Sequence, residues 1–360
     1  MAIEEVLNYA ILNGASDIHI TVGRPRSFRI HGEIVSMDDK ILTPQDTESL
    51  GREITTEEQR KKIQEVGGID FGFTFSNEHR FRVSLFKQRG HHAMVLRLLA
   101  DKFLTLEAIG LPPQFVELLS RPRGLILVTG PTGSGKTTSL ATMLDYINTN
   151  FSKHIITIED PIEIMHKHKK SIVTQRELES DVPSFSEAVV KALRQDPDVI
   201  LIGEMRDIAT MEAAIRAAET GHLVFSTLHT TGAARTVDRI IDVFPANQQE
   251  QIRVQLSGTL MAVLSQTLLP RVDGQGRVAA TEIMIANHAI RNLIREGKTY
   301  QVSSEIQIGT RFGMRDLDAH LKELYGKGVI SYDDMLEMAQ NPKELSETAS
   351  KLTLNAPKKK

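Results

Sequence analysis

The fold of this chain is decided by the stretch Gly130-Pro131-Thr132-Gly133-Ser134-Gly135-Lys136-Thr137-Thr138. This stretch, called the phosphate loop below, fits the pattern of a glycine, any four residues, and then Gly-Lys-Ser/Thr. An apolar run at residues 125–128 precedes it and predicts a buried strand, whereas residues 137–147 after it predict a helix. Strand, glycine-rich loop and helix together predict an α/β fold in which the loop backbone faces the phosphates of a nucleotide.

The phosphate loop also predicts which groups hold that nucleotide. Lys136 is expected to neutralise the terminal phosphates, and the hydroxyl of Thr137 is expected to ligate Mg²⁺. The other residues expected to bind the nucleotide are Pro131, Thr132, Gly133, Ser134, Gly135 and Thr138. The predicted cofactors are ATP and Mg²⁺, although the loop alone leaves GTP open.

Composition indicates an ordinary soluble globular protein. The chain has 360 residues, 41% hydrophobic and 25% charged, which suffices for two domains with cores of their own. The net charge of -3 argues against nucleic acid as the main partner. Because the chain has no cysteine, disulfides and cysteine-based zinc sites are excluded. No apolar run approaches the ~20 residues that span a bilayer, and the acidic N-terminus lacks a signal-peptide pattern, so we expect a cytoplasmic protein.

Residues 1–100 predict a small α+β domain. Apolar residues recur with a helical period over residues 3–12, and Thr43 and Thr56 each begin a helix-start signal. Strand-like runs follow at residues 70–75, 80–86 and 93–99.

A second domain is expected after a segment that contains three prolines. Residues 101–122 predict a linker with a short helix. From residue 123 apolar strands alternate with helices, which predicts a parallel sheet. The strands are expected at residues 125–129, 155–158, 199–202 and 223–225. We expect a mostly helical chain from Gln248, a domain end at residue 345 and a disordered tail at residues 346–360.

Acidic residues follow two of these predicted strands. In an open parallel sheet, ligands bind beyond the carboxyl ends of the strands. Glu204, after the strand at residues 199–202, is the expected water-activating carboxylate. Many nucleotide hydrolases carry Asp-Glu there, whereas this chain carries Gly203-Glu204, so a second carboxylate must come from elsewhere. Glu159 or Glu163 is expected to supply it.

Two histidines flank the predicted strand at residues 223–225. His229 follows it at the same edge and is expected to sense the γ-phosphate by hydrogen bonding. His222 precedes it and is better placed for a subunit or domain contact. Neither spacing suggests a metal site.

Three arginines precede the phosphate loop, in the other predicted domain. Arg80 and Arg82 share one face of a strand because strand side chains alternate, and Arg97 lies on a nearby strand-like run. The residues alone leave two roles open: a solvated surface paired with acids, or arginine fingers that reach a nucleotide.

Four segments in this order make the chain resemble the secretion ATPase superfamily, the hexameric motors of type II secretion and type IV pili. These segments are residues 130–137, 159–163, 193–207 and 221–230, and they contain Arg194 and His222 as further candidate residues. Within that superfamily, residues 16–19, 80–83 and 289–298 are similar to those of the pilus retraction ATPases.

The resemblance implies a PAS-like N-terminal domain, a RecA-like ATPase domain and a homohexamer with nucleotide between the two domains. It implies that Arg80, Arg82 and Arg97 help to close the nucleotide site. It also implies a role in pilus retraction and twitching motility, at the inner face of the cytoplasmic membrane. The implied partners are an inner-membrane platform protein and, indirectly, pilin, with membrane association through the platform and no nucleic acid.

Other functions remain open at this stage. A pilus assembly or type II secretion ATPase usually carries an extra N-terminal domain and a four-cysteine zinc insertion, so the absence of cysteine favours retraction. An accessory ring subunit is a second alternative. A RecA-like nucleic-acid motor is a third, disfavoured by the net charge of -3 and the absence of tryptophan.

Residues 289–298 carry no phosphate-binding pattern, and the resemblance implies that they form a segment that retraction motors need for pulling. Its apolar stripe predicts a surface helix packed on the core. We expect Arg291→Ala combined with Arg295→Ala to retain ATPase activity and lose retraction.

Overall fold

The computed structural model describes residues 2–30, 32–76, 79–99 and 103–349. The chain divides into two compact units, residues 1–102 with 161–165 and residues 103–160 with 166–360. This division differs from the predicted linker at residues 101–122. Leu106, Phe115 and Leu119 are buried in the core of the second unit, so residues 103–122 belong to that unit and not to a linker.

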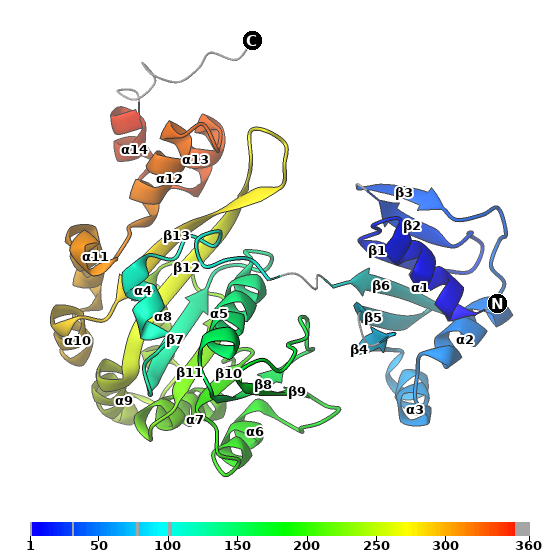
Figure 1. Ribbon diagram of the computed structural model, residues 1–360, viewed down its shortest axis with the longest axis horizontal. Helices are drawn as coiled ribbons and strands as arrows, with labels where there is room; N and C mark the ends of the chain where they lie inside the picture. Colours follow the sequence, from blue (N-terminus) through cyan, green and yellow to red (C-terminus); the bar gives the residue numbers. More distant parts are fainter. Residues whose placement is uncertain (1, 31, 77–78, 100–102, 350–360) are drawn as a thin grey trace. The chain divides into compact units, whose positions relative to one another are not determined.

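The first unit is an antiparallel sheet of six strands with three helices, in the order β3-β2-β1-β6-β5-β4 (Figure 1). Its elements are α1 (Ile3–Leu12), β1 (Asp17–Ile20), β2 (Ser27–Ile30), β3 (Glu33–Ser36), α2 (Pro44–Glu53), α3 (Glu57–Val66), β4 (Gly68–Phe75), β5 (His79–Gln88) and β6 (His91–Leu98). Along β5 the residues Phe81, Val83 and Leu85 are buried, whereas Arg82 between them is exposed. The predicted two-residue alternation is therefore confirmed.

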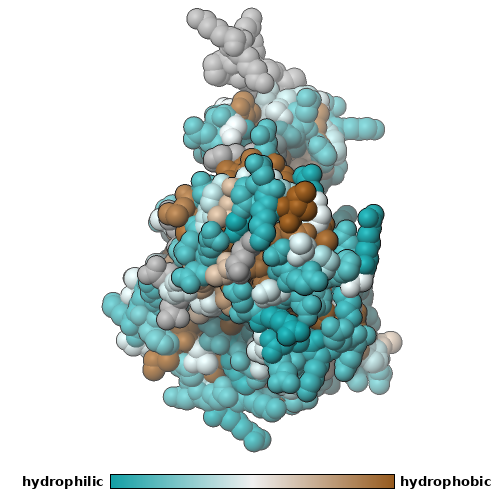
Figure 2. Space-filling view, turned by 90° about the vertical axis from the view of Figure 1, so that its right-hand side faces the viewer, coloured by the Kyte–Doolittle hydropathy of each residue, from teal (hydrophilic) through white to brown (hydrophobic). Residues whose placement is uncertain are grey.

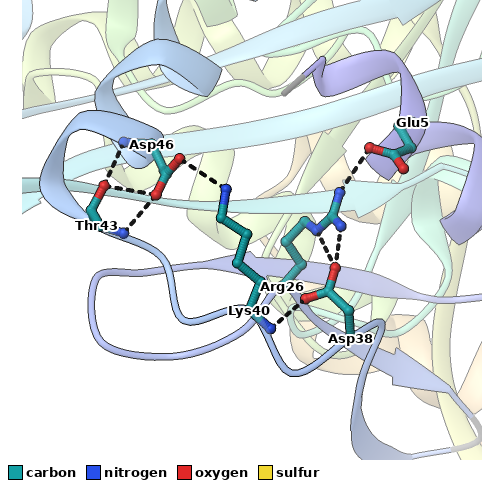
Figure 3. A network of polar contacts seen from close by, with 6 residues as sticks. All are labelled: Glu5, Arg26, Asp38, Lys40, Thr43 and Asp46. Atoms are coloured by element: carbon teal, nitrogen blue, oxygen red, sulfur yellow. Dashed lines mark hydrogen bonds and ion pairs between the residues drawn. The ribbon is translucent and has the colours of Figure 1, made fainter.

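Polar side chains cap the starts of α2 and α3 and attach α1 to the rest of the unit. Thr43 and Asp46 form the predicted capping box of α2, as Thr56 and Gln59 do for α3. Arg26, only 6% exposed, donates to Glu5 of α1 at 3.0 Å and also to Asp38 (Figure 3). This buried guanidinium ties α1 to the segment that leads into α2.

The second unit is built on a sheet of seven strands in the order β13-β12-β7-β11-β10-β8-β9. All neighbours in it are parallel except β12 and β13. Its elements are α4 (Pro113–Leu118), β7 (Gly124–Thr129), α5 (Lys136–Asn150), β8 (His154–Glu159), β9 (Ile172–Glu177), α6 (Phe185–Ala192), β10 (Val199–Ile202), α7 (Ile208–Glu219), β11 (Leu223–Leu228), α8 (Ala233–Asp242), α9 (Ala246–Thr259), β12 (Leu260–Pro270), β13 (Arg277–Ile285), α10 (His288–Arg295), α11 (Val302–Ile308), α12 (Leu317–Gly326), α13 (Tyr332–Met338) and α14 (Pro342–Ala349), with 3₁₀ turns at Thr299–Gln301 and Thr310–Phe312.

Helices cover both faces of this sheet (Figure 1). On β7, Leu125 and Leu127 belong to one core cluster and Ile126 and Val128 to the other, because successive side chains point to opposite faces. Helices α4 and α5 complete the second cluster, and α6 to α11 complete the first. Burial on both faces explains why the central strands are continuous apolar runs. The doubly covered parallel sheet confirms the predicted fold class.

The chain after Gln248 is mostly helical, as expected, but the prediction missed two strands. Strands β12 and β13 form a long antiparallel hairpin, paired from Ala262 with Ile285 to Pro270 with Arg277. Residues 260–264 are apolar without alternation because both faces of β12 are buried, so a strand and a buried helix have the same pattern there. The Asp273-Gly274 pair, which lies in the hairpin turn, was the sequence signal that indicated a hairpin instead of a helix.

Helices α12 to α14 form a small cluster of their own with the far part of the hairpin, through residues such as Leu321, Met335, Leu345 and Leu269. Helix α14 ends at Ala349, so residues 346–349 of the predicted tail are helical. The remaining residues of that predicted tail, 350–360, lie outside the described residues.

No helix in the described ranges is both long and apolar enough to cross a membrane. On the face drawn in Figure 2, hydrophilic residues predominate and hydrophobic side chains are exposed in small groups.

Candidate functional site

The phosphate loop connects the end of β7 to the start of α5. Gly135 is the N-cap of α5 and adopts a left-handed φ of 89°, which glycine tolerates best. Pro131, Thr132 and Gly133 are exposed, and Lys136, Thr137 and Thr138 are half-buried. The loop therefore offers backbone N–H groups and two threonine hydroxyls next to a helix N-terminus, which is the chemistry that holds phosphate.

Two buried polar groups in this region fit a bound nucleotide. The hydroxyls of Thr129 and Ser134 are buried and make no hydrogen bond within the described part of the chain. Lys136 donates from Nζ to the carbonyl oxygens of Gly130 and Pro131, at 2.8 and 3.0 Å. The lysine thus contacts the mouth of its own loop, where phosphate oxygens are able to replace the two carbonyl oxygens.

The order of the strands places the other candidates along one edge of the sheet. From the phosphate loop after β7, the next strand ends are those of β11, β10 and β8, in that order. They lead into His229, Glu204 and Glu159 respectively. At the usual strand spacing of about 4.8 Å, β10 lies about 10 Å from β7. The sheet therefore brings these candidates to the edge that carries the phosphate loop.

Glu204 is held between two nitrogen-bearing side chains. Its carboxylate lies 2.5 Å from Nη2 of Arg206 and 3.3 Å from Nε2 of His229. The Glu204 side chain is 13% exposed, whereas His229 is 52% exposed. Glu204 is thus a shielded carboxylate at the sheet edge, and His229 connects it to the end of β11, beside the phosphate loop.

Close packing explains why glycine precedes Glu204. A Cβ atom on Gly203 would lie 3.2 Å from the carbonyl oxygen of Ile158 and 3.4 Å from Cα of Glu159. The N–H of Gly203 donates to that same carbonyl of Ile158 at 2.8 Å. An aspartate in this position would require the end of β8 to shift by a few tenths of an ångström, which favours glycine here.

Glu159 and Glu163 were predicted as alternatives, and they lie in different units. Glu159 ends β8 in the second unit, 9% exposed, and accepts from the Thr157 hydroxyl at 2.6 Å and the Gln175 amide at 3.1 Å. Glu163 belongs to the first unit, 3.8 Å from Nη1 of Arg82. Of the two, Glu159 shares a strand edge with Glu204.

The three candidate arginines lie on neighbouring strands of the first unit. Arg82 on β5 is directly opposite Arg97 on β6. Arg97 donates to Asp17 at 2.8 Å, and Arg80 donates to the carbonyl of Ile162 at 2.7 Å. Burial raises the pKa of Asp17, but the hydrogen bonds from Arg97 and Ser16 and the nearby positive charges together hold this pKa below its ordinary value. The three arginines therefore form one basic strip on β5 and β6.

His222 and Arg194 lie at the other ends of their strands. His222 precedes β11, and its Nδ1 lies 3.0 Å from the carbonyl of Ala217 at the end of α7. Arg194 is exposed in the turn before β10. Strand direction separates both residues from the phosphate loop, whose edge is formed by the carboxyl ends of the strands.

The structure changes the interpretation of Arg291. Its guanidinium donates to the carbonyls of Ala286, Ser257 and Gly258, at 2.9, 2.7 and 3.0 Å. Burial lowers its pKa. Arg291 thus joins α10 to the end of α9, and Arg291→Ala is not the clean probe of force coupling that the sequence analysis expected. Arg295 is exposed and remains suitable.

Two neighbours of the site, Arg206 and Gln266, were not predicted from the sequence. Arg206, which follows Glu204 by two residues, pairs with its carboxylate. Gln266 of β12 contacts the phosphate loop across a sequence separation of 132 residues. The sequence pointed to Gln266 only in that it is a polar residue within the largely apolar run at residues 260–270.

The chain is similar to known proteins over nearly its whole length. The model of the family described as "Type II/IV secretion system protein" matches residues 1–345. The chain is 48% identical to the "Type IV pilus retractation ATPase PilT" of Pseudomonas aeruginosa, over 95% of this chain and 99% of that protein. It is also 48% identical to a "Twitching motility protein" of Neisseria gonorrhoeae, over 88% of this chain and 85% of that one.

A solved structure is similar over nearly the whole chain. It is described as the crystal structure of the pilus retraction motor PilT and bound ADP, and it superposes with a TM-score of 0.90 at 51% identity. The match covers 96% of this chain and 99% of that chain.

Proposed function

The chain belongs to the family of type II/IV secretion system proteins, and on that premise we propose that it is an ATPase motor that drives type IV pilus retraction. The proposal is supported by the identity of 48% to a pilus retraction ATPase along almost the full length of both chains. The observation that carries it is the sheet edge itself, where the phosphate loop, His229 and the shielded Glu204 follow adjacent strands.

In the proposed hydrolysis, Glu204 orients and deprotonates the attacking water. A carboxylate that is mostly removed from solvent and held on both oxygens keeps its position during the reaction. Lys136 exchanges the carbonyls of Gly130 and Pro131 for phosphate oxygens and offsets their charge. His229 connects Glu204 to the strand beside the phosphate loop and so responds to the γ-phosphate.

Mg²⁺ supplies charge neutralisation between the β- and γ-phosphates when it is bound. Thr137 would hold it through its hydroxyl, as the first threonine of the motif. Glu159 is the better candidate for the supporting carboxylate, because it ends the strand beside β10; Glu163 remains the alternative.

The motor is proposed to act as a homohexamer at the inner face of the cytoplasmic membrane, on an inner-membrane platform protein and through it on pilin. The proposed nucleotide site is completed by Arg80, Arg82 and Arg97. A strip of arginines suits this role because the guanidinium stays charged and binds phosphate oxygens in a fixed fork.

The decisive experiment replaces Glu204 by glutamine and measures both chemistry and pili. Glu204→Gln is expected to bind Mg·ADP normally and to hydrolyse ATP about 100-fold more slowly, the size of a lost general base. In a piliated host without its own retraction ATPase, wild-type protein should restore twitching. Glu204→Gln should leave excess surface pili.

The matched control is Glu212→Gln, an exposed acid on α7 that pairs with Arg216 one turn away. It should behave as wild type in both assays. Bald cells in the absence of the protein would contradict retraction and support an assembly motor instead. ATPase activity near normal in Glu204→Gln would remove Glu204 from the chemistry.

A further inference from the structure

Gln266 is a buried polar residue on a strand that is otherwise mostly apolar. It lies on β12, next to β7, and is only 4% exposed. Its amide nitrogen Nε2 donates to the carbonyl of Ser134 at 2.6 Å, and its Oε1 accepts from the Ser139 hydroxyl at 2.8 Å. One side chain therefore joins the phosphate loop to the first turns of α5.

The backbone around Gln266 is in equally close contact with the loop. A Cβ atom on Gly130 would lie 2.2 Å from the carbonyl oxygen of Gln266, closer than any real Cβ contact. A Cβ atom on Gly135 would lie 3.1 Å from Nε2 of Gln266. Both ends of the loop thus pack against this one residue.

The hydrogen bond to Ser134 sets the direction of a peptide group in the phosphate loop. In a planar trans peptide, the C=O and the following N–H point in opposite directions. Because the C=O of Ser134 points to Gln266, the N–H of Gly135 points away from β12. N–H groups of such loops bind phosphate only when they converge on the anion, so the orientation of this peptide contributes directly to the nucleotide site.

We propose that Gln266 is a positioning residue for nucleotide binding, which orients the Ser134–Gly135 peptide toward the phosphates. The inference rests on the proposed function only in that the loop binds nucleotide. The positioning role requires a side chain as long as glutamine that donates one hydrogen bond and accepts another. Glutamate lacks the donor, and methionine has similar shape but neither group.

The test compares Mg·ADP binding and ATP hydrolysis in Gln266→Met, Gln266→Glu and wild type. Gln266→Met should raise the Kd for Mg·ADP and the KM for ATP about 10-fold, since an unpaired buried carbonyl and a freed peptide weaken the loop. The kcat should change less than threefold, because Glu204 is untouched. Gln266→Glu should be at least as impaired, since it sets a second acceptor against the Ser134 carbonyl.

Two controls separate positioning from stability. Ser265→Ala removes the neighbouring buried hydroxyl of β12, which accepts from the N–H of Gly232 at 2.8 Å, and should leave the Kd within twofold of wild type. Ser139→Ala removes only the second bond of Gln266 and should raise the Kd about twofold to threefold. Kd values are measured well below each variant's melting temperature.

The outcomes are distinct. If wild type fails to bind Mg·ADP, the proposed function fails first. If wild type binds and Gln266→Met has the same Kd, Gln266 has only a structural role and the inference is overturned. A Kd raised in Gln266→Met and Gln266→Glu but unchanged in Ser265→Ala supports the inference.

Discussion

Replacing Arg291 by alanine should destabilise the second unit before it affects any motor property. Arg291 lies on α10, and its guanidinium donates to three carbonyls at the end of β13 and the end of α9. The last carbonyls of a helix have no partner within the helix, so an arginine that binds them acts as a cap from outside. Without it, the carbonyls of Ala286 and Ser257 remain largely buried.

The size of the effect follows from these bonds. Each hydrogen bond is worth about 1 kcal/mol net, so the loss of three costs about 3 kcal/mol of unfolding free energy. For a unit of this size, each kcal/mol shifts the melting temperature by about 2–4 °C, which gives a decrease of about 6–12 °C. Arg295 is exposed on the same helix, and its Nη1 lies 3.4 Å from Oδ1 of Asn292. Replacing it by alanine should lower the free energy of unfolding by less than about 0.5 kcal/mol.

Scanning calorimetry of the two variants, with urea unfolding as a second method, measures this difference. If Arg291→Ala melts within about 1 °C of Arg295→Ala, the carbonyl contacts carry no stability and the structural interpretation is refuted. If Arg291→Ala is the less stable variant, as expected, Arg295→Ala is the appropriate probe of coupling. It should retain ATPase activity and abolish retraction. A parallel loss of both activities in Arg295→Ala would indicate assembly or stability instead.

Further predictions concern the loop, pH and the arginines. Lys136→Ala should abolish measurable Mg·ATP binding in a fluorescence titration, and near-normal affinity would exclude the lysine from the phosphate site. Burial and Arg315 lower the pKa of His320 to about 4 from 6.5, so the unfolded chain binds a proton that the folded chain does not and stability falls as the pH falls from 6.5 toward 4. His320→Asn should reduce the urea-measured loss between pH 7 and pH 4.5 by about 2 kcal/mol, whereas an unchanged slope would contradict this cause. Glu204→Ala and the double variant Arg80→Ala with Arg82→Ala should each be nearly inactive as ATPases. If the arginines act on the site of another subunit, mixing the two proteins should restore ATPase activity. Mixed hexamers that are verified by native mass spectrometry and remain inactive would reject a shared site.

Local signals predicted a large part of the fold. The capping boxes of α2 and α3 form where Thr43 and Thr56 indicated, because a cap involves residues only three positions apart. The hairpin of β12 and β13 could not be separated from a helix by periodicity, since burial on both faces removes the alternation. Burial in the tertiary structure, and not local propensity, determines that these residues form strands.

The site was predictable where it depends on strand ends. Glu204 and His229 were each placed at the carboxyl end of a strand, and the structure brings them to 3.3 Å because those strands are neighbours. Gln266 and Arg291 were not predictable in their contacts. Their partners lie far along the chain, and no pattern in one sequence encodes which backbone carbonyl a buried amide or guanidinium meets.

The tight fit of Gly203 against the end of β8 also has a consequence for how the site is lost. Because Gly203 stands where a second acid would crowd the end of β8, the proposed carboxylates of Glu159 and Glu204 come from two different strands, β8 and β10. The pair exists only while β8 and β10 remain hydrogen-bonded in register. Local unfolding of that strand pair would therefore dismantle the acidic part of the site as a unit, even with the phosphate loop intact on β7.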